Sequence, residues 1–255
     1  MATVTQTQSP QPLIEVRDFH KSYGSKKVHK GMNFNLYPNE VVSLIGGSGS
    51  GKSVLLRAMI GLESPDKGVI FFKGRDITHL SEEQWNEVRK SIAYAFQGGA
   101  LFDSLSVEEN LLYPLEAHTK FSRKEKQVKI DATLEMLGLK GSNNLFPSDL
   151  SGGMQKRAGL ARALILDPEV ILYDEPTAGL DPFNTKNIQD IINDLKSKGR
   201  AGILVTHDMP TAMATCERMS LLIDGKIAVC GTLKEIEDHP VVRSFITGEF
   251  AYGKT

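Results

Sequence analysis

Short apolar segments, separated by turns rich in glycine and proline, run through most of the chain. Residues 13–19 and 32–36 alternate between apolar and polar positions, which is typical of half-buried strands. Residues 170–173 are apolar without a break, as in a parallel strand that is covered on both faces. The same signals indicate further strands at residues 41–45, 69–72, 92–96, 202–206, 219–223 and 227–229. The pattern therefore predicts a β-rich α/β body, with 13–19 and 32–36 as antiparallel strands.

The stretch of about residues 98–159 has a helical and polar pattern instead. A helix is expected to start at Ser106–Glu109 and to be limited by Pro114, because proline removes a backbone donor and clashes with the preceding turn. A charged amphipathic helix is expected at 124–137, ended by the glycine that follows it. The mixed charges at 123–126 indicate a solvated surface. The α/β body is thus interrupted by a helical insert.

A glycine-rich loop lies between the apolar run 41–45 and a helix-like segment at 54–60. The loop reads Gly46-Gly47-Ser48-Gly49-Ser50-Gly51-Lys52-Ser53. Strand, loop and helix in this order form a phosphate cradle, in which glycines let backbone N–H groups turn toward an anion. Lys52 is expected to meet the outer phosphates, and the Ser53 hydroxyl to ligate Mg²⁺. A merely flexible loop explains neither the spacing nor its flanks, so the stretch indicates a nucleoside triphosphate site.

Two acidic residues, Asp174 and Glu175, end the apolar strand at 170–173. Carboxylates at the end of a buried strand are costly unless a cation or a reactive water is their partner. Asp174 suits Mg²⁺, and Glu175 suits polarising the water that attacks a γ-phosphate. A solvated acidic turn would look the same, but a phosphate loop in the same chain favours the functional interpretation.

A second candidate for anion binding is the stretch Leu150-Ser151-Gly152-Gly153-Met154-Gln155. Ser151 can cap the helix that follows, and Gly152 and Gly153 leave its first N–H groups uncovered. Alone, the stretch reads as a routine helix cap. Beside a phosphate loop it becomes a second phosphate contact, which two chains could share if they met face to face.

Two single residues, His207 and Tyr23, are further candidates for nucleotide contacts. His207 follows the strand at 202–206, in the crevice where open α/β sheets bind ligands, and a γ-phosphate contact is expected there. Tyr23 precedes the glycine-rich loop and could stack on a base, although an aromatic packed on its neighbours would look the same. No role is assigned to the remaining histidines, which are His20, His29, His79, His118 and His239.

Composition narrows the class of protein. Thirty basic and 31 acidic residues give a formal charge of −1, so nothing in the balance indicates a nucleic-acid partner. Cys216 and Cys230 lack metal-ligand spacing and are expected to be two buried, reduced thiols in a cytosolic protein. No apolar run approaches the roughly 20 residues that cross a bilayer, so any membrane link is expected to run through a partner.

With these pieces in this order, about residues 13–236 resemble the nucleotide-binding subunit of an ABC transporter. The resemblance implies an α/β fold with a P-loop NTPase (RecA-like) core, an antiparallel β subdomain and an inserted α-helical subdomain at about 98–159. It implies an active ATPase that uses ATP and Mg²⁺ and works as a homodimer. The ATP-binding domain would span 13–240, after a disordered lead at 1–12 and before a short tail at 241–255.

The resemblance also implies a role for each motif. Tyr23 resembles the adenine-stacking aromatic, Gly46–Ser53 the Walker A loop, and Gln97 the glutamine that touches Mg²⁺ and couples to the membrane subunit. Leu150–Gln155 is similar to the signature motif, which contacts ATP in the opposite protomer. Asp174 resembles the Walker B aspartate, and Glu175 the catalytic glutamate. Ala178–Asp181 looks like the dimer-contacting D-loop, and His207 like the switch histidine.

The stretch Gln97–Asn110 looks like the corresponding stretch of Mla-type phospholipid transporters and their Mce-linked relatives. Many small-solute importers place proline where Asp103 stands. The resemblance therefore implies a multi-span permease docking near Gln97–Val107, an Mce-domain lipid-binding partner, and a place on the cytoplasmic face of the inner membrane.

Three alternatives are weighed against this interpretation. A polar amino-acid or other small-solute importer is the nearest one. DNA-repair members of the family need a long coiled-coil insert, and the sequence has no heptads of that length. Ribosome-acting members usually carry two cassettes in one chain, and this sequence has one phosphate loop. A P-loop kinase or GTPase of another family would leave Ser151–Gln155 unexplained.

Overall fold

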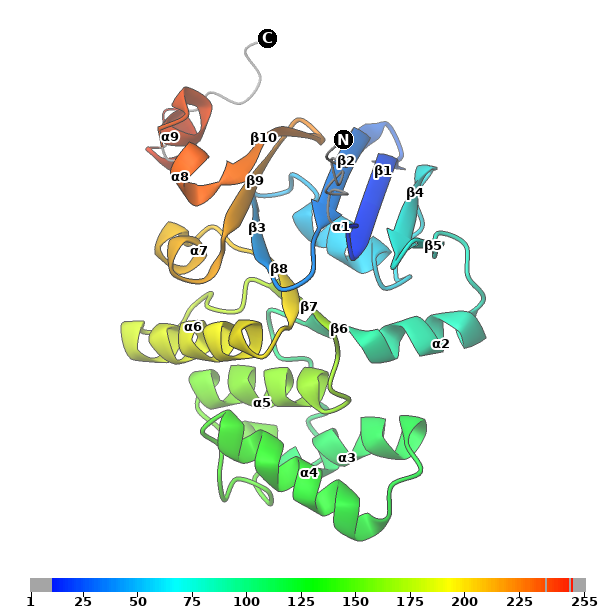
Figure 1. Ribbon diagram of the computed structural model, residues 1–255. Coiled ribbons are helices and arrows are strands. Elements are labelled where there is room, and N and C mark those ends of the chain that lie inside the picture. The colour runs from blue at the N-terminus through cyan, green and yellow to red at the C-terminus, as the bar shows by residue number, and fades with distance from the viewer. Residues whose placement is uncertain (1–10, 237, 248, 250–255) are drawn as a thin grey trace, which may run out of the picture.

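A six-stranded sheet forms the centre of the protein, for which a computed structural model describes residues 11–236, 238–247 and 249. The strand order is β10-β9-β3-β8-β7-β6 (Figure 1). The strands are β3 (Val41–Gly46), β6 (Ile92–Ala95), β7 (Val170–Asp174), β8 (Ala201–Val205), β9 (Arg218–Ile223) and β10 (Lys226–Thr232). All neighbours pair in parallel except β9 and β10. The predicted parallel character of β7 is confirmed.

The apolar run in β7 is buried on both faces of this sheet. Val170 and Leu172 belong to the hydrophobic cluster on one face, and Ile171 and Tyr173 to the cluster on the other. Because side chains alternate between the faces of a strand, a strand covered on both sides needs apolar residues at every position. Residues of four helices pack on the face that carries Ile171 and Tyr173, namely α3 (Val107–His118), α4 (Arg123–Met136), α5 (Gly152–Leu164) and α6 (Pro182–Ser197). The carboxyl ends of the strands stay open to ligands.

A second, antiparallel sheet lies beside the first in the order β2-β1-β4-β5. Its strands are β1 (Ile14–Tyr23), β2 (Lys26–Leu36), β4 (Lys67–Phe72) and β5 (Arg75–Asp76). Both β1 and β2 extend well beyond the predicted segments, toward Tyr23 and Lys26. These extensions are mostly polar and are held by strand pairing, from His20 with Lys30 to Tyr23 with Lys26, so apolar periodicity could not reveal them.

The helices surround the six-stranded sheet. Figure 1 shows α3, α4 and α5 below the sheet, α6 and α7 to its left, and α8 and α9 beyond β10. Their bounds are α1 Lys52–Ala58, α2 Glu82–Ser91, α3 Val107–His118, α4 Arg123–Met136, α5 Gly152–Leu164, α6 Pro182–Ser197, α7 Met209–Thr215, α8 Leu233–Ile236 and α9 Pro240–Ile246. A 3₁₀ turn covers Pro147–Asp149. The predicted fold class, with its antiparallel sheet and helical insert, is confirmed.

The prediction that Pro114 limits its helix is wrong. Helix α3 continues past Pro114 to His118, and the amide of Thr119 still donates to the carbonyl of Leu115 at 3.0 Å. An interior proline costs about 3 kcal/mol in an isolated helix. Leu111 and Leu115, one turn apart and fully buried in the helical cluster, hold the helix together across the proline. Tertiary packing outweighs local propensity here.

The prediction of two buried thiols is half wrong. Cys216 is buried, but Cys230 is exposed. Cys230 lies on the edge strand β10, whose alternate residues face solvent. Apolar composition could not show this, because burial of a residue in an edge strand depends on which face it occupies.

The chain ends lie partly outside the described residues. Of the expected disordered lead at 1–12, residues 1–10 are not described, and of the expected tail at 241–255 the structure describes 241–247 and 249. Helix α9 occupies the first part of that tail. Within the described ranges, no helix is both long and apolar enough to cross a membrane.

Candidate active site

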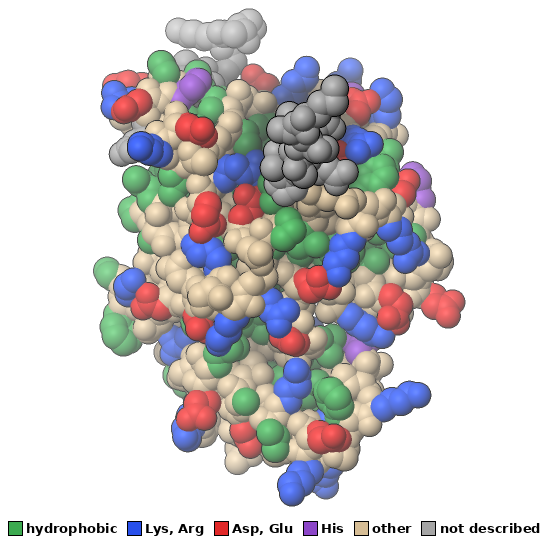
Figure 2. All heavy atoms as spheres, in the orientation of Figure 1, with side chains coloured by type: hydrophobic (Ala, Val, Ile, Leu, Met, Phe, Trp, Pro, Cys, Tyr) green, Lys and Arg blue, Asp and Glu red, His purple; other side chains and the backbone are tan. Residues whose placement is uncertain are grey.

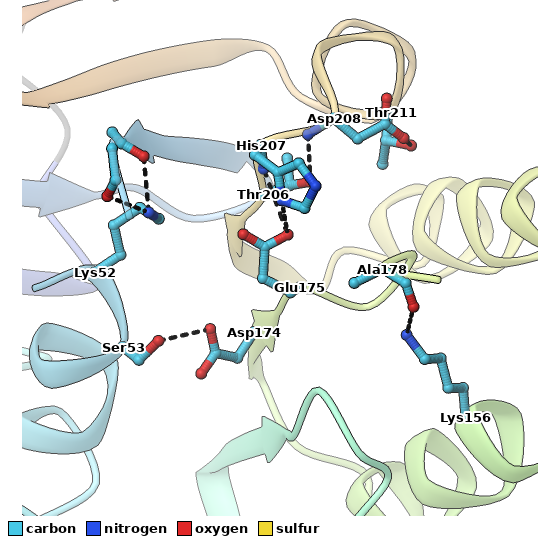
Figure 3. A network of polar contacts seen from close by, with 12 residues as sticks. Lys52, Ser53, Lys156, Asp174, Glu175, Ala178, Thr206, His207, Asp208 and Thr211 are labelled. Carbon is cyan, nitrogen blue, oxygen red and sulfur yellow. Dashed lines mark hydrogen bonds and ion pairs between the residues drawn. The ribbon is translucent and has the colours of Figure 1, made fainter. Parts of the chain in front are cut away.

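The candidate residues meet because neighbouring parallel strands end at one edge of the sheet. The glycine-rich loop follows β3, His207 follows β8, and Asp174 and Glu175 stand at the end of β7. In the sheet β8 lies between β3 and β7, and β6, which precedes Gln97, lies next to β7. Segments far apart in sequence therefore converge where open α/β sheets bind ligands. Figure 3 shows Lys52 and Ser53 to the left of Asp174 and Glu175, and His207 directly above Glu175.

The glycine-rich loop (Gly46–Ser53) is held by its own lysine. The Lys52 ammonium donates to the carbonyls of Gly46 at 2.8 Å and Gly47 at 3.1 Å. A Cβ on Gly46 would stand 2.7 Å from the carbonyl oxygen of Leu222, so only glycine fits there. Burial lowers the pKa of Lys52, while the charges of Glu175 and Asp174 oppose that shift. The two acids that face the loop therefore favour the charged form of Lys52, against the larger effect of burial.

Asp174 links the loop to two neighbouring strands. Ser53 Oγ donates to Asp174 Oδ1 at 2.9 Å, and the hydroxyl of Tyr94 donates to Asp174 Oδ2 at 2.6 Å. Burial and the hydrogen bond to Asp174 both raise the pKa of Tyr94, so the phenol remains a donor. Both carboxylate oxygens are therefore fixed, and the one beside Ser53 faces the loop.

Glu175 and His207 form a direct pair. Nδ1 of His207 lies 2.9 Å from Glu175 Oε2, and the backbone N–H of His207 approaches the same oxygen at 3.4 Å. The Glu175 side chain is 15% exposed and that of His207 73%, so the acid is sheltered and the ring reaches outward. Glu175 has φ 51°, an unusual value for a residue other than glycine, and its amide donates to Val205 at 2.9 Å. Such outliers persist where the surrounding structure fixes them, often at functional sites.

Tyr23 stands at the mouth of the same region. A pocket is lined by Tyr23, Lys26, Val28, Gly49, Gly51, Lys52, Ser53 and Val54. Tyr23 is 45% exposed as a residue, and its hydroxyl donates to Glu63 Oε1 at 2.7 Å. The hydroxyl is thus anchored while a large part of the ring stays open to a ligand.

The stretch Leu150–Gln155 lies apart from the glycine-rich loop. Ser151 caps α5 by accepting from the amide of Met154 at 3.3 Å, as expected for a helix start. Gln155 donates to the carbonyls of Pro147 at 2.8 Å and Leu150 at 3.3 Å. Among the described residues, no hydrogen bond joins this stretch to Gly46–Ser53.

Asp181 connects that stretch with the segment that follows β7. It caps α6 by accepting from the amide of Asn184 at 3.0 Å, and a Cβ on Gly153 would stand 2.5 Å from the Asn184 side chain. Lys156, on α5, donates to the carbonyl of Ala178, as Figure 3 shows. Helix α5 and the segment 178–181 are therefore coupled by direct contacts in the same chain.

Gln97 projects from the end of β6 and is exposed. No hydrogen bond of its side chain is found within the described part of the chain, so it is available to a ligand or a partner.

The sequence did not predict a role at the site for two residues near the glycine-rich loop, Tyr94 and His29. Tyr94 was expected only as part of a buried strand, yet it holds Asp174. His29, to which no role was assigned, lies beneath the loop. A tyrosine inside a short apolar strand would have been the signal for the first. For the second, the signal is a histidine at an inward-facing strand position, where an apolar residue is usual.

Fold and site together define an ATPase of the P-loop class. The sequence pattern described as "ABC transporter" matches residues 29–178. Among curated proteins, Trigalactosyldiacylglycerol 3, chloroplastic, of Arabidopsis thaliana is 42% identical over 92% of this chain and 74% of its own. The intermembrane phospholipid transport ATP-binding protein MlaF of Escherichia coli is 35% identical over 94% and 91% of the two chains. The probable ribonucleotide transport ATP-binding protein mkl of Mycobacterium leprae is 40% identical over 92% and 69%.

Solved structures agree with this family. A dimeric ATP-binding cassette in a post-hydrolysis state, bound to ADP and Pi, is 30% identical, with a TM-score of 0.80 over 86% of this chain and 98% of that one. The protein cbiO1 of Clostridium perfringens, part of the ABC transporter complex cbiONQ, is 27% identical, with a TM-score of 0.81 over 94% and 96% of the two chains. The chain belongs to the ABC transporter family. It is the ATP-binding and ATP-hydrolysing subunit of such a transporter.

Proposed function

We propose that this ATPase drives the movement of phospholipid between membranes, as a homodimer bound to a permease on the cytoplasmic face of the inner membrane. The observation that carries the proposal is the match to MlaF, which spans nearly the whole of both chains. The Arabidopsis relative is named after a galactolipid, which supports a lipid substrate in the broader sense. The name of the mycobacterial relative points to ribonucleotides instead, and a polar amino-acid or other small solute is the remaining alternative.

In this proposal, residues from the edge of the sheet hold ATP. Tyr23 stacks on adenine, and the N–H groups of the glycine-rich loop and the Lys52 ammonium bind the phosphates. Glu175 accepts the proton of the attacking water and orients it, since its carboxylate is sheltered and backed by His207. His207, which reaches outward, contacts the γ-phosphate.

The donors around Asp174 fit Mg²⁺. Ser53 Oγ and Asp174 Oδ1 are hard oxygen ligands 2.9 Å apart, and Gln97 follows the neighbouring strand. Mg²⁺ commonly binds to one or two protein oxygens together with substrate phosphates, so no larger acidic cluster is needed. When bound, the ion neutralises negative charge on the phosphates.

A second copy of the chain would complete the site. Within the described part of the chain, no hydrogen bond joins Ser151, Gly152, Gly153 or Gln155 to the glycine-rich loop of the same chain, and Ser151 and Gly152 are exposed. In a face-to-face dimer they would contact ATP held by the other protomer, with Asp181 at the contact between the two. Dimeric cassettes among the similar structures support this arrangement.

Ser151→Arg tests the shared site. The bulky cation should block approach of the second protomer, so ATP hydrolysis should fall by at least about 100-fold, whereas ADP binding to one chain should change less than about threefold. The matched control is Ser122→Arg. Ser122 also caps an exposed helix by accepting an amide at 3.3 Å, so both variants lose one capping bond, about 1 kcal/mol. Unchanged hydrolysis in Ser151→Arg would argue against the dimer.

The surface near Gln97–Val107 suits the permease. Phe96, Phe102 and Tyr113 are 42%, 41% and 58% exposed. The rings of Phe102 and Tyr113 meet edge to face with centroids 5.4 Å apart, and Arg162 lies 4.5 Å above Phe102. Exposed aromatic side chains and arginine are enriched at protein interfaces.

Buried Asn110 makes this surface rigid. Its amide nitrogen lies 3.0–3.1 Å from the carbonyls of Phe102, Leu105 and Ser106, and its oxygen accepts from the amide of Phe102 at 2.8 Å. A loop held in this way offers a fixed aromatic platform, joined through β6 to Asp174. Movement of the permease and closure of the ATP site can thus be coupled.

Purification of the intact complex tests the substrate. We expect a multi-span permease and an Mce-domain lipid-binding protein to co-purify, and the reconstituted complex to move fluorescent phospholipid between vesicles only when ATP is hydrolysed. Figure 2 shows acidic and basic side chains interspersed on one face of this subunit, with no patch of a single sign on that face. Co-purification of a periplasmic solute receptor, without lipid transfer, would favour the importer.

A further inference from the structure

His29 on β2 is buried directly against the glycine-rich loop. Only 1% of the residue is exposed, and its Nε2 lies 3.0 Å from the carbonyl oxygen of Gly51. A Cβ on Gly51 would stand 2.6 Å from that nitrogen and 2.4 Å from Val28, so loop and strand are in close contact. The ring of Phe19 meets the imidazole edge-on, with centroids 5.1 Å apart.

The hydrogen bond fixes the state of the ring. A carbonyl can only accept, so Nε2 carries the proton and Nδ1 is bare. Within the described part of the chain, Nδ1 is buried and has no hydrogen-bond partner. Burial lowers the pKa of His29, and the bond to Gly51 only partly opposes this shift, so the ring is neutral.

This arrangement is unfavourable for stability alone. A buried polar atom without a partner costs free energy, and the neighbours Phe19 and Val28 would accommodate an apolar side chain. The Gly51 carbonyl does not need the histidine either, because it also accepts from the amide of Leu55 at 3.1 Å. Local departures from good packing that bring no stability are expected at functional sites.

The bond does fix the direction of one loop amide. The Gly51 carbonyl and the Lys52 N–H belong to the same planar trans peptide and point in opposite directions. With the carbonyl held by His29 on one side, the Lys52 N–H is turned to the other side. The Leu55 amide holds the same carbonyl from the helix side at 3.1 Å, and His29 adds a second donor from β2 at 3.0 Å, so the orientation of this peptide is set from two elements.

We propose that His29 is a positioning residue for nucleotide binding, which aims the Lys52 amide at the phosphates by holding the Gly51–Lys52 peptide from below. The inference rests on the proposed role of the glycine-rich loop as the phosphate cradle. His29 also joins the glycine-rich loop to the antiparallel sheet, where His29 and Tyr23 lie on the paired strands β2 and β1. The sheet would then set base and phosphate contacts together.

Binding of Mg²⁺–ADP, measured by calorimetry, tests the proposal without hydrolysis. His29→Leu removes the donor, and we expect the dissociation constant to rise about five- to tenfold, the usual effect of one lost hydrogen bond. The melting temperature without nucleotide should stay the same or rise, because the unpartnered Nδ1 is gone. His29→Gln keeps a donor at the same distance along the side chain and should bind ADP within about twofold of wild type.

Two controls separate this inference from its premise. Met32→Leu changes a fully buried residue of the same strand and should leave ADP affinity unaltered. Lys52→Ala should abolish binding; if it does not, the loop assignment itself is wrong. If Lys52→Ala fails to bind while His29→Leu binds like wild type, or while His29→Leu and His29→Gln are weakened equally, the inference on His29 alone is overturned. Should His29→Leu not fold, His29→Met replaces it in the same comparison.

Discussion

Replacement of Lys52 by alanine is expected to abolish ATP binding. The ammonium is the cation held over the glycine-rich loop, and it makes hydrogen bonds to the carbonyls of Gly46 and Gly47. Hydrogen bonds between charged groups contribute about 1.5–3 kcal/mol each, so loss of contacts to two phosphate oxygens should weaken binding by at least about 100-fold. Calorimetry with ATP and with ADP measures the effect.

The expected loss has a second cause in the same structure. Asp174 and Glu175 face the loop, and their charges act on Lys52. Without the ammonium, a triphosphate would approach two carboxylates with no fixed cation between them. ATP, which carries the larger negative charge, should therefore lose more affinity than ADP.

Lys73→Ala is the matched control for this variant. Lys73 is half-exposed and pairs with Glu169 at 2.5 Å, at the far end of β7. A surface pair of this kind contributes about 0–1 kcal/mol to stability, and its loss should leave ATP affinity unchanged. Near wild-type affinity in Lys52→Ala would refute the assignment of the loop.

The sequence predicted the sheet better than the helical insert. Buried parallel strands such as β7 need apolar residues at every position, so they are visible in a single chain. The sequence predicted that helix α3 ends near Pro114, because proline has a low helix propensity. In the structure the helix continues, because Leu111 and Leu115 pack against other helices. Cys230 was misplaced for a similar reason, since its exposure depends on the edge position of β10. A local sequence pattern does not reveal packing between residues that are far apart in the chain.

The candidate site shows the same division. Glycine spacing and two acids after an apolar strand predicted the roles of Gly46–Ser53 and Asp174, because phosphate chemistry needs those residue types in that order. His207 and Glu175 meet because β8 and β7 are neighbours in the sheet, and no sequence motif specifies that strand order. Tyr94 and His29 act from buried positions where their side chains look like core residues, so only the contacts to Asp174 and Gly51 reveal them. Residues that act from buried positions are therefore harder to predict than residues that belong to a motif.

Glu175→Gln is expected to bind ATP but to hydrolyse it about 10²–10⁴-fold more slowly, the range that positioned general bases contribute. Glutamine has the same shape, and its oxygen can still accept from Nδ1 and the backbone amide of His207, so the local geometry should persist. What is lost is the ability to take a proton from the attacking water. The variant also removes a negative charge beside the γ-phosphate, so a closed, ATP-bound dimer should accumulate.

Two measurements on Glu175→Gln separate these effects. The rate of phosphate release by the permease-bound complex reports the chemical step, and size-exclusion chromatography with and without ATP reports the dimer. Glu169→Gln, at the other end of β7, removes an acid of the same type that pairs only with Lys73 among the described residues, and both readouts should stay at wild-type values. Rapid turnover in Glu175→Gln would remove Glu175 as the base. Slow turnover with no ATP-dependent dimer would leave the base in place and contradict the shared site, because a trapped nucleotide must hold two protomers together if Ser151 of one chain contacts ATP in the other.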